Sequence, residues 1–274
     1  MGILLQARRL TAEARWGLGI LLPILALSAL VPALSPYSAL TGADLTLAPP
    51  SPAHPFGTDN LGRDVLVRTF AAAQLDVALA LAGVSIPLIC GTIVGALVAT
   101  SRAATVSAIW TMIIEGINAF PFLVLVIGIV AIVGPGAVGV VIALSLTNWA
   151  RYARIARARA LALREADFIA ATYVLGYSRS RVLLRHLLPN VYSEALAYGL
   201  SDFVIVIITV AGLTFLGLGI RPPAPEWGGM MSDGRLFLTR AWWIPVFPGL
   251  ALSLTAISVT LLAQGISAQV RGDA

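Results

Sequence analysis

The chain has 274 residues, of which 58% are apolar and 11% charged, and its formal net charge is +5. This composition is typical of an integral membrane protein and excludes an ordinary soluble domain. All 18 basic residues are arginine, and the lack of lysine excludes a GxxxxGK[ST] phosphate-binding loop and Schiff-base chemistry.

Cysteine and histidine are too scarce for most metal and redox sites. Cys90 is the single cysteine, so the sequence has no disulfide framework and no thiolate metal site. His54 and His186 lie far apart in segments of different character, and we expect no zinc pair and no other metal site. The arginines flank apolar segments, which favours contact with membrane lipid over nucleic acid.

An apolar segment, Trp16 to Leu34, follows a polar start that contains Arg8, Arg9 and Arg15. We interpret it as a first membrane span with the N-terminus in the cytosol. A cleaved signal peptide is the alternative, but the apolar core of such a peptide is about 7–15 residues long.

Residues 35 to about 74 are expected outside the membrane. A proline-rich part, LAPPSPAHP, predicts an extended strap, and FGTDNLGRDVLVRTF follows it. Thr58 or Asp59 is predicted to cap a short helix that offers Arg63 and Asp64 outward. This helix either lies on the outer leaflet or forms a lip that touches a delivered substrate or its carrier. The candidate residues are Gly57, Thr58, Asp59, Gly62, Arg63 and Asp64.

The remaining apolar segments complete a predicted all-α integral membrane protein with six transmembrane helices in a single domain, residues 1–274. The predicted spans are about 16–34, 77–100, 106–133, 137–152, 191–216 and 245–266. Pro87 interrupts the second span and Pro121 the third, and both are potential bend points. The fourth is expected to continue as a helix into its arginine-rich flank.

A charged segment between the fourth and fifth spans, residues 164–190, divides at Gly176. Glycine permits the positive φ that ends one helix and turns the chain. Glu165–Leu175 is the predicted first helix, and Arg179–Leu188 is the second, which is expected to stop before Pro189. The side chains expected to be buried are Phe168, Ile169, Tyr173 and Leu175, and those expected outside are Arg179, Arg181 and Arg185. An elbow of this kind in the cytosol predicts a docking surface.

The arginines are distributed unequally between the two sides of this arrangement. Thirteen fall on the side assigned to the cytosol and five outside, which satisfies the positive-inside rule and puts both termini in the cytosol. The five outside are Arg63, Arg68, Arg221, Arg235 and Arg240.

Three polar side chains inside predicted spans are candidates for a translocation path. Asp202 lies near the middle of the fifth span, and Glu115 and Asn118 share one face of the third. An acid at membrane depth is unfavourable unless it meets water or a partner group. The alternative is a structural acid that is hydrogen-bonded to a neighbouring helix or to a partner protein.

Three segments together resemble a known family. HPFGTDNLGRDVL forms an outer motif, the helix–Gly–helix is followed by HLLPN, and LTFLGLGIRPPAPEWGGMMSDGR follows the fifth span. In these segments the chain resembles the permease subunits of bacterial ATP-binding-cassette importers for dipeptides, oligopeptides and nickel, specifically the second, C-type permease of the pair.

The resemblance implies a bacterial inner-membrane protein that forms half of a path for small peptides or metal chelates. Its expected partners are a second homologous permease, two ATPase subunits and an extracytoplasmic substrate-binding protein. ATP and Mg²⁺ would bind the ATPases, so this chain would be neither an enzyme nor a cofactor carrier. The implied docking-loop residues are Glu165, Asp167, Ala170, Ala171, Gly176, Arg179, Arg181 and Pro189.

The sequence departs from the family pattern in the loop, where Glu-Ala-Ala is replaced by Ala170-Ala171-Thr172. Because nickel-type permeases tend to have weakened loops, this departure favours a metal or chelate cargo. The acidic family tail is also replaced, by Gln264-Gly265.

Two other classes of membrane protein remain as alternatives. A self-contained channel or secondary transporter would predict an internal repeat and a polar pore pattern, and the sequence shows neither. A membrane-embedded enzyme would need paired catalytic groups at one depth, for which this residue inventory is poor.

Overall fold

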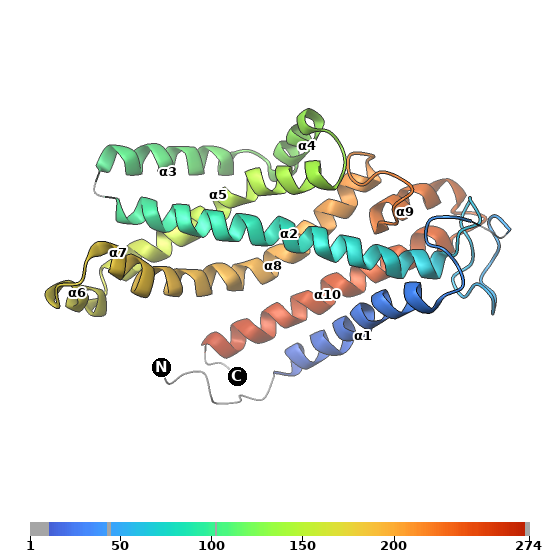
Figure 1. Ribbon diagram of the computed structural model, residues 1–274, viewed down its shortest axis with the longest axis horizontal. Helices are drawn as coiled ribbons and strands as arrows, with labels where there is room; N and C mark the ends of the chain where they lie inside the picture. The colour runs from blue at the N-terminus through green and yellow to red at the C-terminus, as the bar shows by residue number, and fades with distance from the viewer. Residues whose placement is uncertain (1–10, 43–44, 102, 272–274) are drawn as a thin grey trace.

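The computed structural model describes residues 11–42, 45–101 and 103–271. This part of the chain is helical, with an isolated β-bridge between Thr58 and Asp64. Figure 1 shows an elongated bundle whose long helices run along one axis. These helices are α1 (Ala12–Leu34), α2 (Val65–Thr100), α5 (Ala137–Arg164), α8 (Leu188–Phe215) and α10 (Trp243–Arg271). Arg8, Arg9 and Arg102, which were assigned to the cytosolic side, lie outside the described residues.

The two terminal helices pack against each other through small residues. A Cβ on Gly17 of α1 would lie 2.7 Å from the Ser258 carbonyl oxygen, and one on Gly265 would lie 2.5 Å from Thr11 Oγ1. Glycine at both crossings lets the backbones approach closely, as in other membrane helix pairs. The start of α1 and the end of α10 consequently lie toward the same end of the bundle (Figure 1).

α2 is longer than the predicted second span, because it begins at Val65 instead of about residue 77. The prediction of a separate short helix capped by Thr58 or Asp59 was wrong. Asp64 is the N-cap, and its carboxylate accepts a hydrogen bond from the Val67 N–H at 2.8 Å. The helix continues unbroken after this cap, through Pro87, so residues expected before the span and those expected in it form one helix of 36 residues.

α5 lies against α2 at two glycines. A Cβ on Gly91 would lie 2.3 Å from the Trp149 carbonyl oxygen, and one on Gly95 would lie 2.2 Å from that of Ala153. Both positions therefore require glycine for this close crossing. As expected, α5 continues past residue 152 and ends at Arg164.

The predicted third span is broken into α3 (Ala104–Ala119) and α4 (Phe122–Val133), which are bent by 94°. Phe120 adopts an extended conformation, with φ −81° and ψ 146°, and Pro121 is the N-cap of α4. A residue before proline is sterically driven out of the helical region, which explains the break at this point. The bend thus lies at Pro121, one of the two predicted bend points, and divides the segment predicted as the third span.

Four helices, α1, α2, α10 and the helix from Arg179 to Phe215, are long and apolar enough to cross a membrane. The bent pair α3–α4 would make a fifth if it is one span. α5 does not qualify by composition, because Asn148, Arg151 and Arg154 lower its mean hydropathy. It nevertheless packs within the bundle, with Ala143 and Ala153 fully buried.

An elbow, residues 164–190, contains α6 (Asp167–Val174) and α7 (Arg179–Val182). Gly176 between them has φ +79°, and the Tyr177 N–H donates to the Thr172 carbonyl at 3.0 Å. This bond is the one that closes a Schellman motif at a helix end. The turn at glycine is thus formed as the sequence predicted.

The apolar face of α6 is narrower than predicted. Ile169 and Thr172 are buried against the bundle, but Phe168, Tyr173 and Leu175 are exposed. The prediction that these last three would be buried was wrong, because a two-turn helix presents a single face to its support and the rest of its surface stays free.

The helix after Gly176 does not stop before Pro189, contrary to prediction. It passes through a π-helical turn, Leu183–Leu187, directly into α8. In this turn the Leu188 N–H donates to the Leu183 carbonyl, one residue further back than in an α-helix. The shifted register precedes the proline, which has no N–H to donate, and so the helix continues. The elbow and α8 are therefore mechanically continuous.

The segment between α8 and α10 contains α9 (Trp227–Gly234) and η2 (Arg235–Phe237). It lies together with the segment before α2, at the end of the bundle opposite the elbow (Figure 1). The two ends thus bring together different sets of polar residues, which are described next.

Candidate functional site

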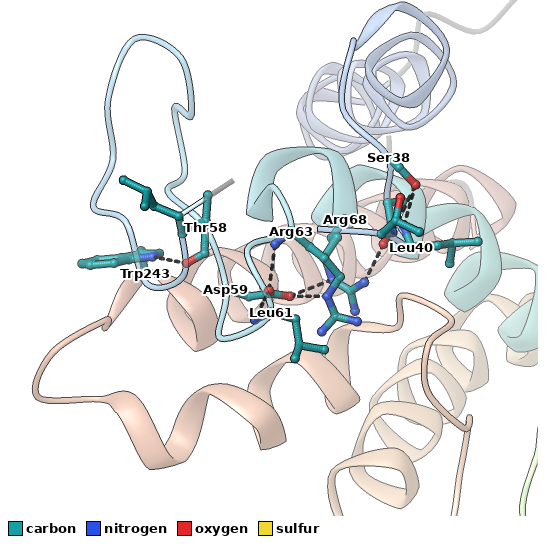
Figure 2. A network of polar contacts seen from close by, with 11 residues as sticks. Ser38, Leu40, Thr58, Asp59, Leu61, Arg63, Arg68 and Trp243 are labelled. Carbon is teal, nitrogen blue, oxygen red and sulfur yellow. Dashed lines mark hydrogen bonds and ion pairs between the residues drawn. The ribbon is translucent and has the colours of Figure 1, made fainter. Parts of the chain in front are cut away.

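At the end opposite the elbow, the sequence motif before α2 folds into a buried polar clasp, which we define as Thr58, Asp59, Arg63, Asp64 and Arg68. Figure 2 shows the Asp59 carboxylate facing the guanidinium groups of Arg63 and Arg68. It accepts a hydrogen bond from Arg63 Nε at 2.7 Å and lies 3.5 Å from Arg68 Nε. The positive φ of Gly62, +73°, turns the chain so that the Arg63 N–H also donates to Asp59 Oδ1.

The other half of the clasp joins the outer strap to two helices. Thr58 accepts a hydrogen bond through its carbonyl from Trp243 Nε1 at 3.1 Å (Figure 2), and its hydroxyl donates to the Leu45 carbonyl at 2.6 Å. Gly57 has φ +71°, and a Cβ there would lie 2.6 Å from Trp243 Nε1. Asp64 caps α2 and also pairs with His54 Nδ1 at 2.8 Å.

All five side chains of the clasp are buried. The prediction that Arg63 and Asp64 would be offered outward was therefore wrong. Guanidinium and carboxylate groups that pair with one another can be buried, and here they hold the strap to α2, while the Thr58 carbonyl joins it to Trp243 of α10. The motif builds the end of the bundle opposite the elbow, and side chains around it, such as the exposed Leu61, form the surface.

A second polar group lies between α5 and α8. Asp202 is 0% exposed, and its Oδ2 accepts a hydrogen bond from Tyr152 Oη at 2.9 Å. Asn148 Nδ2 lies 3.5 Å from the same oxygen. The ring of Tyr198 packs edge-on against Tyr152 at a centroid distance of 5.2 Å. This arrangement resembles the structural alternative for Asp202, in which a carboxyl group joins neighbouring helices.

Glu115 and Asn118 belong to a different environment from Asp202. Glu115 is half exposed and lies 3.8 Å from Arg154 Nη1 of α5. Asn118 donates to the Ile114 carbonyl of its own helix at 2.8 Å. The structure thus brings Glu115 to Arg154 of α5, and among the described residues neither Glu115 nor Asn118 hydrogen-bonds to Asp202.

A third acidic site, which the sequence reasoning missed, joins α2 to α9. Asp76 and Glu226 are both buried and lie close to one another. The Trp227 N–H donates to Asp76 Oδ2 at 3.0 Å, and the Gly229 N–H donates to Glu226 Oε2 at 2.7 Å. Burial raises the pKa of Glu226 to about 7. The sequence signal that could have indicated this site is Asp76, an acidic residue directly before the apolar segment that begins at Val77.

The elbow at the opposite end differs from these sites because its polar residues are exposed. Phe168, Tyr173, Val174 and Leu175 add exposed apolar and aromatic side chains, of which Val174 is 88% exposed. Arg181 lies over the ring of Tyr177, 5.2 Å from its centroid. Every residue that the resemblance implies for docking is exposed, namely Glu165, Asp167, Ala170, Ala171, Gly176, Arg179, Arg181 and Pro189.

Among the described residues, no group of three or more histidine, cysteine, aspartate or glutamate side chains is arranged to hold a metal ion. The buried acids are instead hydrogen-bonded to protein groups. Asp202 accepts from the Tyr152 phenol, Asp76 from the Trp227 backbone N–H, and Asp59 from the Arg63 guanidinium.

The model of the family of binding-protein-dependent transport system inner membrane components matches residues 91–271. A putative peptide transport system permease protein of Brucella suis is 35% identical over 269 residues, which cover 96% of this chain and 90% of that protein. A dipeptide transport system permease protein of Bacillus subtilis is 34% identical over 255 residues, which cover 91% of this chain and 78% of that protein.

Two solved structures share the fold. An inward-facing methionine ABC transporter has a TM-score of 0.57 at 19% identity, covering 76% of this chain and 95% of that chain. An amino acid ABC transporter has a TM-score of 0.55 at 17% identity, covering 72% of this chain and 91% of that chain. The bundle of long apolar helices, the match along residues 91–271 and the similarity along nearly the whole chain agree. The chain belongs to the binding-protein-dependent inner membrane components, as a multi-pass permease subunit of an ATP-binding-cassette importer.

Proposed function

We propose that this permease forms half of the translocation path of an ATP-driven importer for small peptides. The observation that carries the proposal is its 35% identity, over 96% of its length, to a peptide transport system permease protein. A second homologous permease would form the other half of the path, and an extracytoplasmic binding protein would deliver the cargo to the outer end.

The elbow is the proposed contact with one of two ATPase subunits, which would bind ATP and Mg²⁺. Its exposed apolar residues, from Phe168 to Leu175, suit a groove on a partner protein, and Glu165 and Asp167 supply acidic groups beside them. Ala170, which replaces the family's glutamate, leaves these two acids as the proposed electrostatic contacts. The elbow of this chain would therefore bury more apolar area against the ATPase than a loop with the family's Glu-Ala-Ala motif does.

The continuity of the elbow with its helices suggests how movement is transmitted. α5 enters the elbow at Arg164, and the helix that leaves it at Arg179 continues to Phe215. A displacement of α6 by closing ATPases would therefore tilt two long helices together, and the cavity would change side. Pro87 and the break at Pro121 are the proposed places where the bundle bends.

We propose six spans, with α5 as the fourth and α3–α4 together as the third. The burial of α5 between α2 and α8 supports this count although its arginines lower its hydropathy. Both termini would then be cytosolic, together with the elbow, and the clasp would lie outside. The excess of arginine at the elbow end supports this orientation.

The assignment of Asp202, Glu115 and Asn118 to the path remains a prediction. The complete burial of Asp202 inside this subunit favours a role in holding α5 to α8. Glu115 is the better candidate for contact with a cationic cargo or a partner, because half of its side chain is exposed.

A metal-chelate importer is the second candidate for the cargo class. The altered elbow motif had favoured it, whereas the names of the relatives favour peptides. The test is uptake by proteoliposomes that contain both permeases, the ATPases and the cognate binding protein. We expect ATP-dependent uptake of radiolabelled dipeptides, no uptake of free nickel, and loss of uptake without the ATPases. Uptake that persists without ATPases would instead indicate a self-contained transporter.

A further inference from the structure

Two cavities meet at the C-terminal end of α2. One, of about 540 Å³, opens between α2, the end of α5 and the elbow, and the other, of about 400 Å³, lies between α2 and α3. Both are lined by Thr100 and Ser101, so they adjoin at these two residues, and we name the two together the depression. Figure 1 shows the same arrangement, with the end of α2 lying between α3 and α7.

The first cavity, which we name the basic pocket, carries two guanidinium groups and several hydroxyl groups. Arg164 and Arg179 line it, and Ser101 and Ser180 add hydroxyl groups, whereas the Thr100 hydroxyl already donates to the Ala96 carbonyl at 3.0 Å. Arg164 donates one N–H to the Ala99 carbonyl, which fixes its stem and leaves its other donors available. Neither arginine has an ion pair with an acidic group among the described residues. Such a set of donors suits a phosphate group.

The second cavity, which we name the apolar groove, has the opposite chemistry. It is lined by Val94, Leu97 and Val98 of α2 and by Val106 and Trp110 of α3. Leu97 and Val106 are about half exposed, so the groove opens to the side of the bundle, where a membrane helix meets lipid. The indole of Trp110 is held edge-on by Trp149 at a centroid distance of 6.4 Å.

We propose that this depression is a binding site for an anionic phospholipid. Its phosphate and polar headgroup occupy the basic pocket, and one acyl chain lies along the apolar groove. The adjacency of a cationic and an apolar cavity carries the assignment, because a soluble phosphate ester uses the first cavity alone. The elbow end, placed at the cytosolic leaflet under the proposed function, meets a surface rich in anionic lipid. The bound lipid would hold α3 and the elbow against α2.

Two features near the basic pocket are unfavourable for an anion and limit the affinity with which the pocket binds one. The C-terminal end of α2 points partial negative charge at the pocket, and Arg164 offsets part of it by its bond to Ala99. Glu165 and Asp167 follow Arg164 in the chain but do not line the pocket. Arg179 is reassigned by this proposal from ATPase docking to lipid binding, whereas Arg181, which lies over Tyr177, is not.

The headgroup is tested by native mass spectrometry of the full chain with phosphatidylglycerol or phosphatidylcholine. We expect phosphatidylglycerol to bind about tenfold more tightly, since both lipids have phosphate but only the first has net charge. Arg164→Gln/Arg179→Gln should weaken it roughly 25-fold, about 5-fold for each arginine, and Arg179→Gln alone about 5-fold. Arg185→Gln, which removes an equal charge outside the pocket, should leave binding unchanged. Equal affinity for the two lipids overturns the proposal.

The acyl chain is tested by filling the groove. Leu97→Trp should weaken phosphatidylglycerol binding about tenfold, whereas Ile93→Trp, one turn earlier and outside the groove, should not. Glycerol phosphate and inorganic phosphate should bind far more weakly than the lipid. Tight binding of either, with no effect of Leu97→Trp, would assign the pocket to a soluble phosphate instead. The complex with ATPase subunits should retain the lipid, and its displacement by them would assign the arginines to docking. None of these readouts depends on transport.

Discussion

At the scale of single residues, the permease buries several charged side chains that its sequence presents as surface groups. Asp59 holds this arrangement together at the outer end, because two buried arginines lie within 3.5 Å of its carboxylate. Such residues are structural unless a binding partner reaches them, and their substitution tests this directly.

Replacement of Asp59 by asparagine should destabilise the folded chain. The change leaves Arg63 and Arg68 buried without their nearest counter-charge, for which a loss of about 3 kcal/mol is expected. Removal of one partner of a buried ion pair typically costs about 3–5 kcal/mol, and we expect the lower value because Asp233 also attracts both arginines. Thermal unfolding in detergent measures it, and Arg221→Gln, a change at an exposed arginine, is the control. An unchanged unfolding temperature would show that the clasp does not stabilise the fold.

Asp202 can be tested with a pair of substitutions of different polarity. Asp202→Asn keeps an oxygen that accepts from Tyr152, and assembly and peptide uptake should remain near normal. Asp202→Leu leaves the phenol without an acceptor and should cost about 2 kcal/mol and reduce the folded yield. Size-exclusion chromatography and uptake assays measure the two effects. Normal assembly with lost uptake in Asp202→Asn would instead support a place for this charge in the path.

At the scale of elements, the elbow depends on a turn that favours glycine. Gly176 has φ +79° with no atom near its missing Cβ, so a side chain would fit in space but strain the backbone by about 1–2 kcal/mol. Gly176→Val should therefore preserve insertion but reduce ATPase stimulation and uptake.

The matched control for this prediction is Gly134→Val, at a glycine with φ +104° and equally open surroundings in the turn before α5. At φ +104° and ψ +151°, which glycine alone adopts readily, this variant carries at least as much strain away from the elbow and should keep coupling. If both variants couple ATP hydrolysis to uptake normally, the elbow does not act as the docking element.

The contact between α9 and α2 should depend on pH through Glu226. Burial raises the pKa of this carboxyl from 4.5 to about 7, so the folded chain keeps the proton to a higher pH than the unfolded chain. Stability should consequently fall as pH rises from about 4.5 to about 7. Unfolding temperatures at pH 5 and pH 8 measure this slope. Glu226→Gln should reduce it, and Glu194→Gln at an exposed ion pair should not.

At the scale of the whole molecule, the orientation of the bundle is tested by cysteine labelling in a Cys90→Ser background. Ser38→Cys and the exposed Leu236→Cys should react with a membrane-impermeant thiol reagent added to intact spheroplasts. Ser180→Cys in the elbow should react after permeabilisation alone. Labelling of residue 180 in intact spheroplasts would reverse the proposed topology, including the leaflet of the lipid site.

The sequence by itself determined the membrane class, the order of the helices and the turn at Gly176. Hydropathy, arginine distribution and the conformational freedom of glycine are properties of the chain read locally, and each needs no knowledge of its neighbours in space. The same local signals located the break near Pro121 but not its 94° angle, which depends on how α3 and α4 pack.

The tertiary structure alone decided which polar residues meet. Tyr152 and Asp202 lie 50 residues apart, and Trp227 and Asp76 lie 151 apart. The outer motif looked like a charged surface, yet it is buried because its acids and arginines satisfy one another. A buried charge destabilises the fold strongly unless an opposite charge or a hydrogen-bonding group lies beside it. Helix packing decides which group that is, and no local pattern in the sequence records it.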